Sequence, residues 1–172
     1  MEMLSYLASM ISTVLGLFEP FSKKMKTVLI FNFLGNVLVS ISYLLVGSFS
    51  GAATCGTAAV QLLINYSFTA KEKKIPKKLV VVHAVMFLAV NLLTFALWYD
   101  ALVLVAAMLF VLSVAQESTK YYRLLYVSNS LTWIIYDVLA HAYGNLSTHV
   151  ILFISTALAI FFRDIRSRKN MQ

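Results

Sequence analysis

The sequence predicts an all-α, polytopic membrane protein with seven transmembrane helices, and three observations lead to this fold class. Hydrophobic residues make up 60% of the 172 positions and charged residues only 12%, against roughly a quarter charged in soluble domains. The hydrophobic residues form seven runs close to bilayer-spanning length. Lys and Arg gather in every second connection between these runs. The apolar content excludes a disordered chain, and the single cysteine, Cys55, excludes an internal disulfide and a cysteine-based zinc site.

The seven predicted spans leave little of the chain for a soluble domain. A helical span needs about 20 apolar residues, so we expect residues 1–172 to form a single integral membrane domain. The first run has no basic segment before it and is followed by lysines, which predicts a retained helix rather than a cleaved signal peptide. In order along the chain, the predicted spans are residues 3–18, 27–46, 51–69, 79–98, 100–116, 121–140 and 146–162.

Two kinds of connection alternate between the spans. Those around residues 47–50, 98–100 and 141–145 contain no Lys or Arg. All 14 basic residues lie in the other three connections and after the last span: Lys23, Lys24, Lys26, Lys71, Lys73, Lys74, Lys77, Lys78, Lys120, Arg123, Arg163, Arg166, Arg168 and Lys169. Lys and Arg accumulate on the cytoplasmic side, so we expect an inner (plasma) membrane protein with its N-terminus outside and its C-terminus in the cytoplasm. The net charge of +7 then reflects contact with the lipid bilayer, and no nucleic acid partner is expected.

An internal similarity links the second span to the sixth. NVLVSISYLLVGSFSG begins at Asn36 and NSLTWIIYDVLAHAYG begins at Asn129, and the two Asn, two Tyr and two Gly residues match at a constant offset of 93 residues. This predicts two three-helix units, residues 1–70 and 100–172, joined by a basic loop and a linker helix in residues 71–99. Because one linker span restores the orientation, both units insert in the same direction. Parallel repeats of this kind occur in transporters, with the substrate site between them.

This 3+1+3 plan resembles the SWEET sugar facilitators and the wider PQ-loop group, and the chain as a whole resembles the YgjV-type bacterial inner-membrane proteins. Trp133, Tyr136 and Ala140 match positions of the W-x-x-Y-G-L-L-G-x-D turn of the PQ-loop group. The resemblance implies a SWEET-like bundle of seven helices. The Pro-Asn pairs that shape the SWEET sugar pocket fall on Cys55–Gly56 and Thr148–His149 in this chain, which argues against that sugar site.

Polar residues near the middle of the spans predict a pocket. Unpaired polar groups are unfavourable in hydrocarbon, so these side chains are expected to face a partner or water. The predicted substrate-binding residues are Asn36, Gln61, Asn129, Trp133 and Thr156. Their amides, hydroxyl and aromatic face suit a neutral, hydrogen-bonding solute. The alternative is that these groups hydrogen-bond between helices and hold the bundle together.

Four residues near the outer ends of the spans predict a gate. Asp137 is the one acid well inside a span, and it lies about one helical turn from the outer end. His149 begins the last span on the same side, and histidine titrates near neutral pH. With Tyr43 and Tyr136 these residues form the predicted outer gate. The alternative is a solvated rim.

Two functions are therefore considered. The first is a small-solute facilitator or transporter that binds a neutral polar molecule between the repeats. The second is a non-transporting scaffold, lipid-binding protein or partner subunit, because span 100–116 offers almost no polar side chain to a pathway. A homo-oligomer is compatible with both. The chain has no Ser-His-Asp spacing, phosphate loop or zinc-protease motif, so no enzyme activity, cofactor or metal site is expected.

Overall fold

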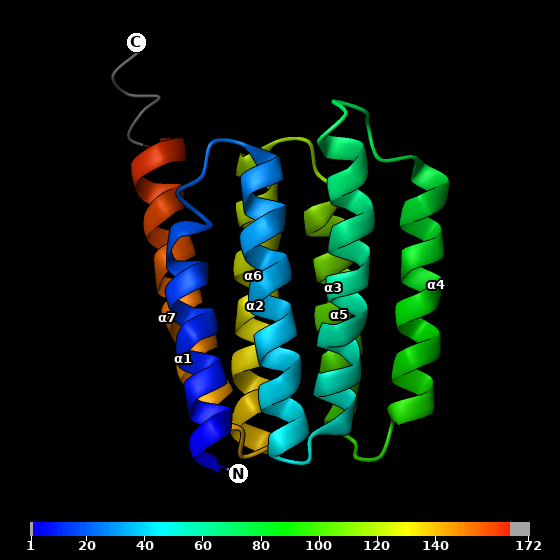
Figure 1. Cartoon of the computed structure of the whole chain (residues 1–172), viewed down its shortest axis with the longest axis vertical. Coiled ribbons are helices and arrows are strands. Elements are labelled where there is room, and N and C mark those ends of the chain that lie inside the picture. The colour runs from blue at the N-terminus through cyan, green and yellow to red at the C-terminus, as the bar shows by residue number, and fades with distance from the viewer. Residues whose placement is uncertain (1, 166–172) are drawn as a thin grey trace.

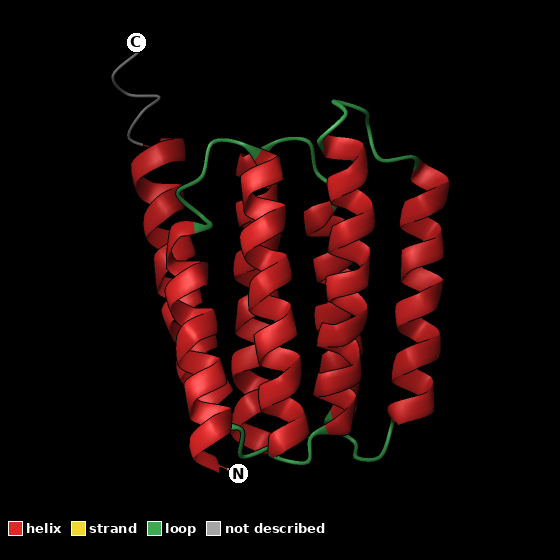
Figure 2. Cartoon of the chain, viewed as in Figure 1, coloured by secondary structure: helices red, strands yellow, loops and turns green. Residues whose placement is uncertain are grey.

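The computed structural model describes residues 2–165, and all regular structure in this part of the chain is helical (Figure 2). The all-α prediction is confirmed. The elements are α1 (Glu2–Phe18), α2 (Met25–Leu45), α3 (Phe49–Thr69), α4 (Lys77–Thr94), α5 (Asp100–Val114), α6 (Thr119–Leu139), α7 (Tyr143–Ala159) and a short π-helical segment, η1 (Ile160–Ile165).

Six of these helices form two layers. α1, α2 and α3 lie side by side in one layer, and α7, α6 and α5 lie behind them in the other (Figure 1). Helix α4 lies at the edge and contacts α3 and α5. Helices α1, α3, α5 and α7 run in one direction and α2, α4 and α6 in the other. As a result, the connections that carry Lys and Arg lie at one end of the bundle.

The predicted spans agree with the helices within about three residues, except at the end of the fourth. We predicted a span of residues 79–98, whereas α4 ends at Thr94. The reason is the Asp100 carboxylate, whose Oδ2 accepts hydrogen bonds from the backbone N–H groups of Ala96 and Leu97, both at 2.9 Å. These two amides turn toward Asp100 instead of continuing the helical ladder, so the chain reverses direction there.

Three helical segments within residues 2–165 are long and apolar enough, by length and composition, to cross a membrane: α2, α4 and the continuous segment Tyr143–Ile165. Helices α1 and α5 are apolar but shorter. Helices α3 and α6 have the length but carry more polar residues, among them Gln61 and Asp137, whose side chains are buried inside the bundle. Large apolar side chains such as Leu34, Leu92 and Leu131 face outward instead. This arrangement suits a hydrocarbon environment.

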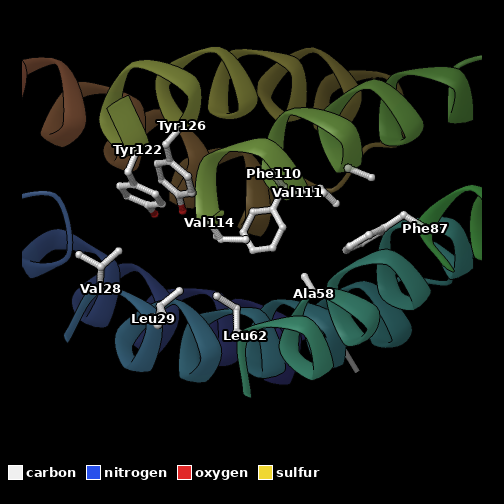
Figure 3. Close-up of a cluster of buried hydrophobic side chains, with 11 residues drawn as sticks. Val28, Leu29, Ala58, Leu62, Phe87, Phe110, Val111, Val114, Tyr122 and Tyr126 are labelled. Carbon is white, nitrogen blue, oxygen red and sulfur yellow. The ribbon is translucent and has the colours of Figure 1, made fainter. Parts of the chain in front are cut away.

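Two hydrophobic clusters fill the space between the layers. The cluster in Figure 3 sets α2, α3 and α4 against α5 and α6, with Leu62, Phe87 and Val111 completely covered and Tyr122 stacked beside Tyr126. The second cluster lies toward the other end of the bundle. It is built on Tyr43, Trp133 and Tyr136 together with small residues of α3 and α5.

Hydroxyl and amide groups join α1 to α7 at the left edge of Figure 1. Ser9 Oγ donates to Asn145 Oδ1 at 2.7 Å, and Thr13 Oγ1 donates to Thr148 Oγ1 at 2.8 Å. Hydrogen bonds of this kind hold helices together where lipid offers no hydrophobic driving force. The two layers are therefore joined by polar contacts at this edge, by hydrogen bonds between α2 and α6, and by apolar packing.

Candidate functional site

Three of the four predicted gate residues form one hydrogen-bonded group. The Tyr43 hydroxyl on α2 donates to Asp137 Oδ1 on α6 at 2.5 Å, and His149 Nδ1 on α7 lies 2.6 Å from Asp137 Oδ2. Asp137 is 0% exposed, so the solvated-rim alternative does not describe it. An ionised carboxylate only accepts hydrogen bonds, so a bond to the ionised form of Asp137 requires the tautomer with hydrogen on His149 Nδ1. This group ties α2 to α6 and α7.

Aromatic rings surround this group. Trp133 lies one helical turn before Asp137 on α6, and its ring stacks on that of His149 with a centroid distance of 5.5 Å and an interplanar angle of 10°. Tyr136, the fourth predicted gate residue, packs edge-on against Tyr43, and its hydroxyl lies 2.7 Å from Ser48 Oγ. Tyr136 and Ser48 line an outer pocket of about 150 Å³. This end of the bundle, at which α1 begins, is thus packed with side chains from both layers. It is called the outer end after the predicted gate, and the opposite end is called the inner end.

A central cavity of about 40 Å³ lies between the layers, below this closure. It is lined mainly from α1, α2, α6 and α7, and α3 and α5 contribute one residue each, Cys55 and Phe110. Of the predicted substrate-binding residues, Asn36, Asn129 and Trp133 line it, and the predicted gate residue His149 does so too. A buried water needs roughly 10–15 Å³ by this measure, so the cavity has room for roughly three water-sized groups.

Two predicted substrate-binding residues lie elsewhere. The Thr156 hydroxyl donates to the Leu152 carbonyl within α7, at 2.7 Å. Gln61 is fully buried, and neither of its amide atoms has a hydrogen-bond partner among the described residues. Neither residue lines the central cavity. The structure therefore brings together Asn36, Asn129 and Trp133, but not the whole predicted set.

The amides that line the cavity are held by protein acceptors. Asn129 Nδ2 donates to the Ala106 carbonyl on α5 at 2.7 Å. Asn36 Nδ2 donates to the backbone carbonyl and to the side-chain oxygen of Asn32, at 2.9 and 2.6 Å. These bonds fix which way each amide points. The side-chain oxygens of Asn36 and Asn129 make no hydrogen bond within the described residues, so they are free to accept one.

The inner end of the cavity contains a carboxyl group that the sequence analysis did not single out. Glu19 follows α1 directly, is 2% exposed and lines the cavity. Its Oε1 accepts a hydrogen bond from Asn32 Nδ2 at 2.9 Å and another from the Tyr122 hydroxyl. Burial raises the pKa of Glu19 to about 8, although the two hydrogen bonds act in the opposite direction. The sequence feature that marks Glu19 is its position as an acid beside Pro20, in a connection otherwise rich in lysine.

A buried ion pair lies next to Glu19 in the fold. Arg123 Nε and Nη2 donate to the two carboxylate oxygens of Asp164 at 3.0 and 2.6 Å, and Arg123 Nη1 donates to the Pro20 carbonyl at 3.0 Å. Both side chains of the pair are less than 10% exposed. In the sequence analysis, Arg123 served only as one of the basic residues that mark the cytoplasmic side. In the structure it fastens the start of α6 to η1 and to the connection between α1 and α2.

The arrangement is a small polar cavity with a hydrogen-bonded closure at each end. Asp137 is the acid of the outer closure, and Glu19 belongs to the inner one. The cavity walls supply amide oxygens, aromatic faces and one carboxyl group. Chemically, such a cavity can hold a small polar molecule and can bind or release a proton.

Comparison with known proteins identifies the family. No match was found among curated proteins or among solved structures. The model of one family, described as a bacterial inner membrane protein and named Imp-YgjV, matches residues 3–168. This match covers nearly the whole chain, including all described helices except the first residue of α1, and it agrees with the apolar outer surface of the bundle. The chain therefore belongs to the YgjV family of bacterial inner membrane proteins.

Proposed function

We propose that this protein is a facilitator or transporter of a small polar solute, with its binding site in the central cavity. The observation that carries the proposal is that cavity itself, which contains buried polar groups and lies between two hydrogen-bonded groups that join the layers. A scaffold has no need to keep a cavity lined by a carboxyl group and three amides. A carrier in its occluded state needs such a site.

The proposed architecture is a 3+1+3 arrangement of parallel repeats, with α1–α3 and α5–α7 as the units and α4 as the linker. Support comes from the two-layer packing, in which equivalent helices run in the same direction (Figure 1). Further support comes from the residues 93 positions apart. Asn36 and Asn129 both line the central cavity, and Tyr43 and Tyr136 both belong to the outer aromatic cluster.

The proposed orientation has the N-terminus outside and the C-terminus in the cytoplasm. It is supported by the basic connections after α1, α3 and α5, which lie together at the end of the bundle opposite the N-terminus (Figure 1). Arg163 in η1 lies at the same end, while Arg166, Arg168 and Lys169 fall outside the described residues. In this orientation Glu19 and Arg123 lie on the cytoplasmic side, and Asp137 lies on the outer side.

Transport in this scheme requires the two closures to open in turn. Opening outward separates Tyr43 from Asp137. Opening inward separates Tyr122 from Glu19 and Asn32, and Arg123 from the Pro20 carbonyl. Each closure contains side chains from both layers, so a rocking motion of one layer against the other breaks one set while the other set holds. This is the alternating-access scheme of repeat-built transporters.

Cys55 offers a direct test, because it is the one cysteine in the sequence and it lines the cavity. We expect a small, membrane-impermeant thiol reagent to label Cys55 slowly in inside-out vesicles, and faster in Arg123→Met, where the inner closure is cut. The control is Cys55→Ser with Leu131→Cys, which places the thiol on the outward apolar surface. Labelling of Cys55 above this control supports the proposal. Protection of Cys55 from both sides, in wild type and variant, favours the scaffold.

The alternative function remains a non-transporting scaffold, lipid-binding protein or partner subunit. The observation in its favour is the uneven lining of the cavity. Helix α5 contributes Phe110 as its one lining side chain, whereas α2 contributes five residues. A pathway that uses the two repeats equally would draw on both units to a similar extent.

A further inference from the structure

The central cavity contains a carboxyl group that no cation neutralises. Glu19 Oε1 accepts two hydrogen bonds, but Oε2 makes none within the described residues. A water-sized group can reach Glu19 Oε2, whereas the amide atoms of Gln61 are completely buried. The Arg123 guanidinium donates to Asp164 and to a backbone carbonyl instead, and no Lys or Arg side chain lines the cavity. A buried carboxylate without a partner is unfavourable, so the cavity favours a positively charged guest.

The other cavity groups suit the same guest. The side-chain oxygens of Asn36 and Asn129 are free acceptors, and in the neutral ring His149 Nε2 is a third. Tyr126 and Trp133 add aromatic faces, which attract cations. Two donors that line the cavity have no acceptor within the described residues, the second N–H of Asn129 and the Trp133 N–H, and both are neutral.

Resting on the proposed function, we infer that the solute is a small organic cation whose ammonium group donates hydrogen bonds to Glu19 and to the side-chain oxygen of Asn36. Asn32 connects these two residues, since it donates to Glu19 and accepts from Asn36. The volume of about 40 Å³ limits the guest in this closed form to an ammonium group with one or two carbon atoms. The neutral solute expected from the sequence took no account of Glu19.

When such a cation binds, it replaces the proton on the Glu19 carboxyl group. Burial raises the pKa of Glu19 to about 8, so the empty site holds a proton at neutral pH. An ammonium group pairs with the ionised carboxylate, and the proton passes to the solvent. Helix α2 faces Glu19 with the uncharged Asn32. The titratable and charged groups around this end of the cavity are Tyr122, Tyr126, Arg123 and Asp164. Cys55 and His149 line the rest of the cavity. Arg123 and Asp164 pair with each other.

The test is a thermal-unfolding titration of the detergent-purified protein at constant ionic strength. The probes are methylammonium, the neutral analogue methanol, and tetramethylammonium, a cation that is too large for the cavity and has no N–H group. We expect methylammonium alone to stabilise the protein, with an affinity that rises between pH 6 and pH 9. In Glu19→Gln, which retains the hydrogen bonds to Asn32 and Tyr122, we expect at least about a tenfold weaker affinity. The control is Glu117→Gln, an exposed acid at the same end of the bundle, which leaves the affinity unchanged.

Each outcome is decisive. Equal stabilisation by methanol, or methylammonium binding that is unchanged in Glu19→Gln, overturns the cation assignment and leaves the solute site in place. No binding of any probe, with Cys55 labelled from water, also overturns the cation assignment alone. No binding together with a fully protected Cys55 overturns the proposed function as well. If Glu19→Gln does not fold, the pH dependence in the wild-type protein decides: an affinity that does not rise with pH contradicts the proposal.

Discussion

Two buried tyrosines of the outer aromatic cluster, one in α2 and one in α6, allow the outer closure to be tested with a matched pair of variants. Tyr43 is 0% and Tyr136 2% exposed, and both hydroxyls are hydrogen-bonded. The partner of Tyr43 is the carboxylate of Asp137, whereas the partner of Tyr136 is the neutral hydroxyl of Ser48. Replacing either tyrosine by phenylalanine removes one oxygen and keeps the ring, so aromatic packing is preserved in both variants.

The magnitudes follow from the charge of the acceptor. A hydrogen bond to a charged group contributes about 1.5–3 kcal/mol, and one between neutral groups about 0.5–1.5 kcal/mol. We therefore expect Tyr43→Phe to lower the free energy of unfolding by about 2 kcal/mol and Tyr136→Phe by about 1 kcal/mol. In an Asp137→Asn background the acceptor of Tyr43 is neutral, so the effect of Tyr43→Phe falls to about 1 kcal/mol. The double-mutant cycle then gives a coupling energy of about 1 kcal/mol.

The assay is unfolding of the purified protein in mixed micelles with increasing sodium dodecyl sulfate, followed by far-ultraviolet circular dichroism. Each variant is compared at the midpoint of the wild-type transition, which avoids a long extrapolation. Two results refute the reasoning. One is a Tyr43→Phe effect no larger than that of Tyr136→Phe. The other is a Tyr43→Phe effect that is the same with and without the Asp137 carboxylate.

Three further predictions concern the inner end and the α3–α4 interface. Because the pKa of Glu19 is raised to about 8 in the folded state, its contribution to stability is complete below about pH 4.5 and is lost as the pH rises through about 8. Thermal unfolding measured from pH 4 to 9 should show this loss of stability in the wild type and not in Glu19→Gln. An equal pH dependence in both proteins would contradict the prediction. Arg123→Met leaves the buried Asp164 carboxylate unpaired and should lower the free energy of unfolding by about 3–5 kcal/mol. The double variant Arg123→Met/Asp164→Leu should recover most of this stability. A loss below about 1 kcal/mol for Arg123→Met in the same micelle assay would argue against a structural ion pair. Gln61 and His83 are buried without hydrogen-bond partners among the described residues. The double variant Gln61→Met/His83→Leu should retain or raise the midpoint temperature of thermal unfolding, because apolar groups of similar size replace unsatisfied polar atoms. A fall of several degrees would show that these polar atoms bind a ligand or a water.

The fold was largely predictable because helix length in a membrane is set by bilayer thickness and apolar runs mark it directly. The end of α4 was not, because the Asp100 carboxylate turns the backbone before the apolar run is finished. Apolar residues such as Leu97 and Trp98 continue beyond the helix into the connection, so composition alone gives no sign of the boundary.

The candidate site was predictable in part. Asn36 and Asn129 were found because they lie 93 residues apart, the same separation as Tyr43 and Tyr136. Gln61 has a similar depth and helical position but does not line the cavity. Spacing along a helix shows which residues share a face, but not which helix that face packs against. In α3 the polar face turns to α4, where Thr54 Oγ1 donates to Asn91 Oδ1 at 3.3 Å.

Glu19 and the Arg123–Asp164 pair were missed for a different reason. All three residues lie in or beside segments that the sequence marks as span boundaries, where charged residues normally face water or headgroups. Their partners come from distant parts of the chain: Glu19 and Tyr122 are 103 residues apart, and Arg123 and Asp164 are 41 apart. No local pattern reports contacts of this range. Only the packing of α6 against the other layer brings these residues together.

The hydrogen bonds between the two layers also determine when, during synthesis of the chain, the polar groups of α2 find their partners. Asn32 and Tyr43 on α2 bond to partners on α6 that lie 90 and 94 residues later in the chain. At about 5–20 residues per second, the ribosome delivers those partners roughly 5–20 seconds after α2 is made. During that interval the first three helices must keep their inward polar groups hydrated or in contact with the insertion machinery. A nascent chain stalled before α6 should therefore remain beside the translocon, and release into lipid should follow the arrival of Tyr122 and Asp137.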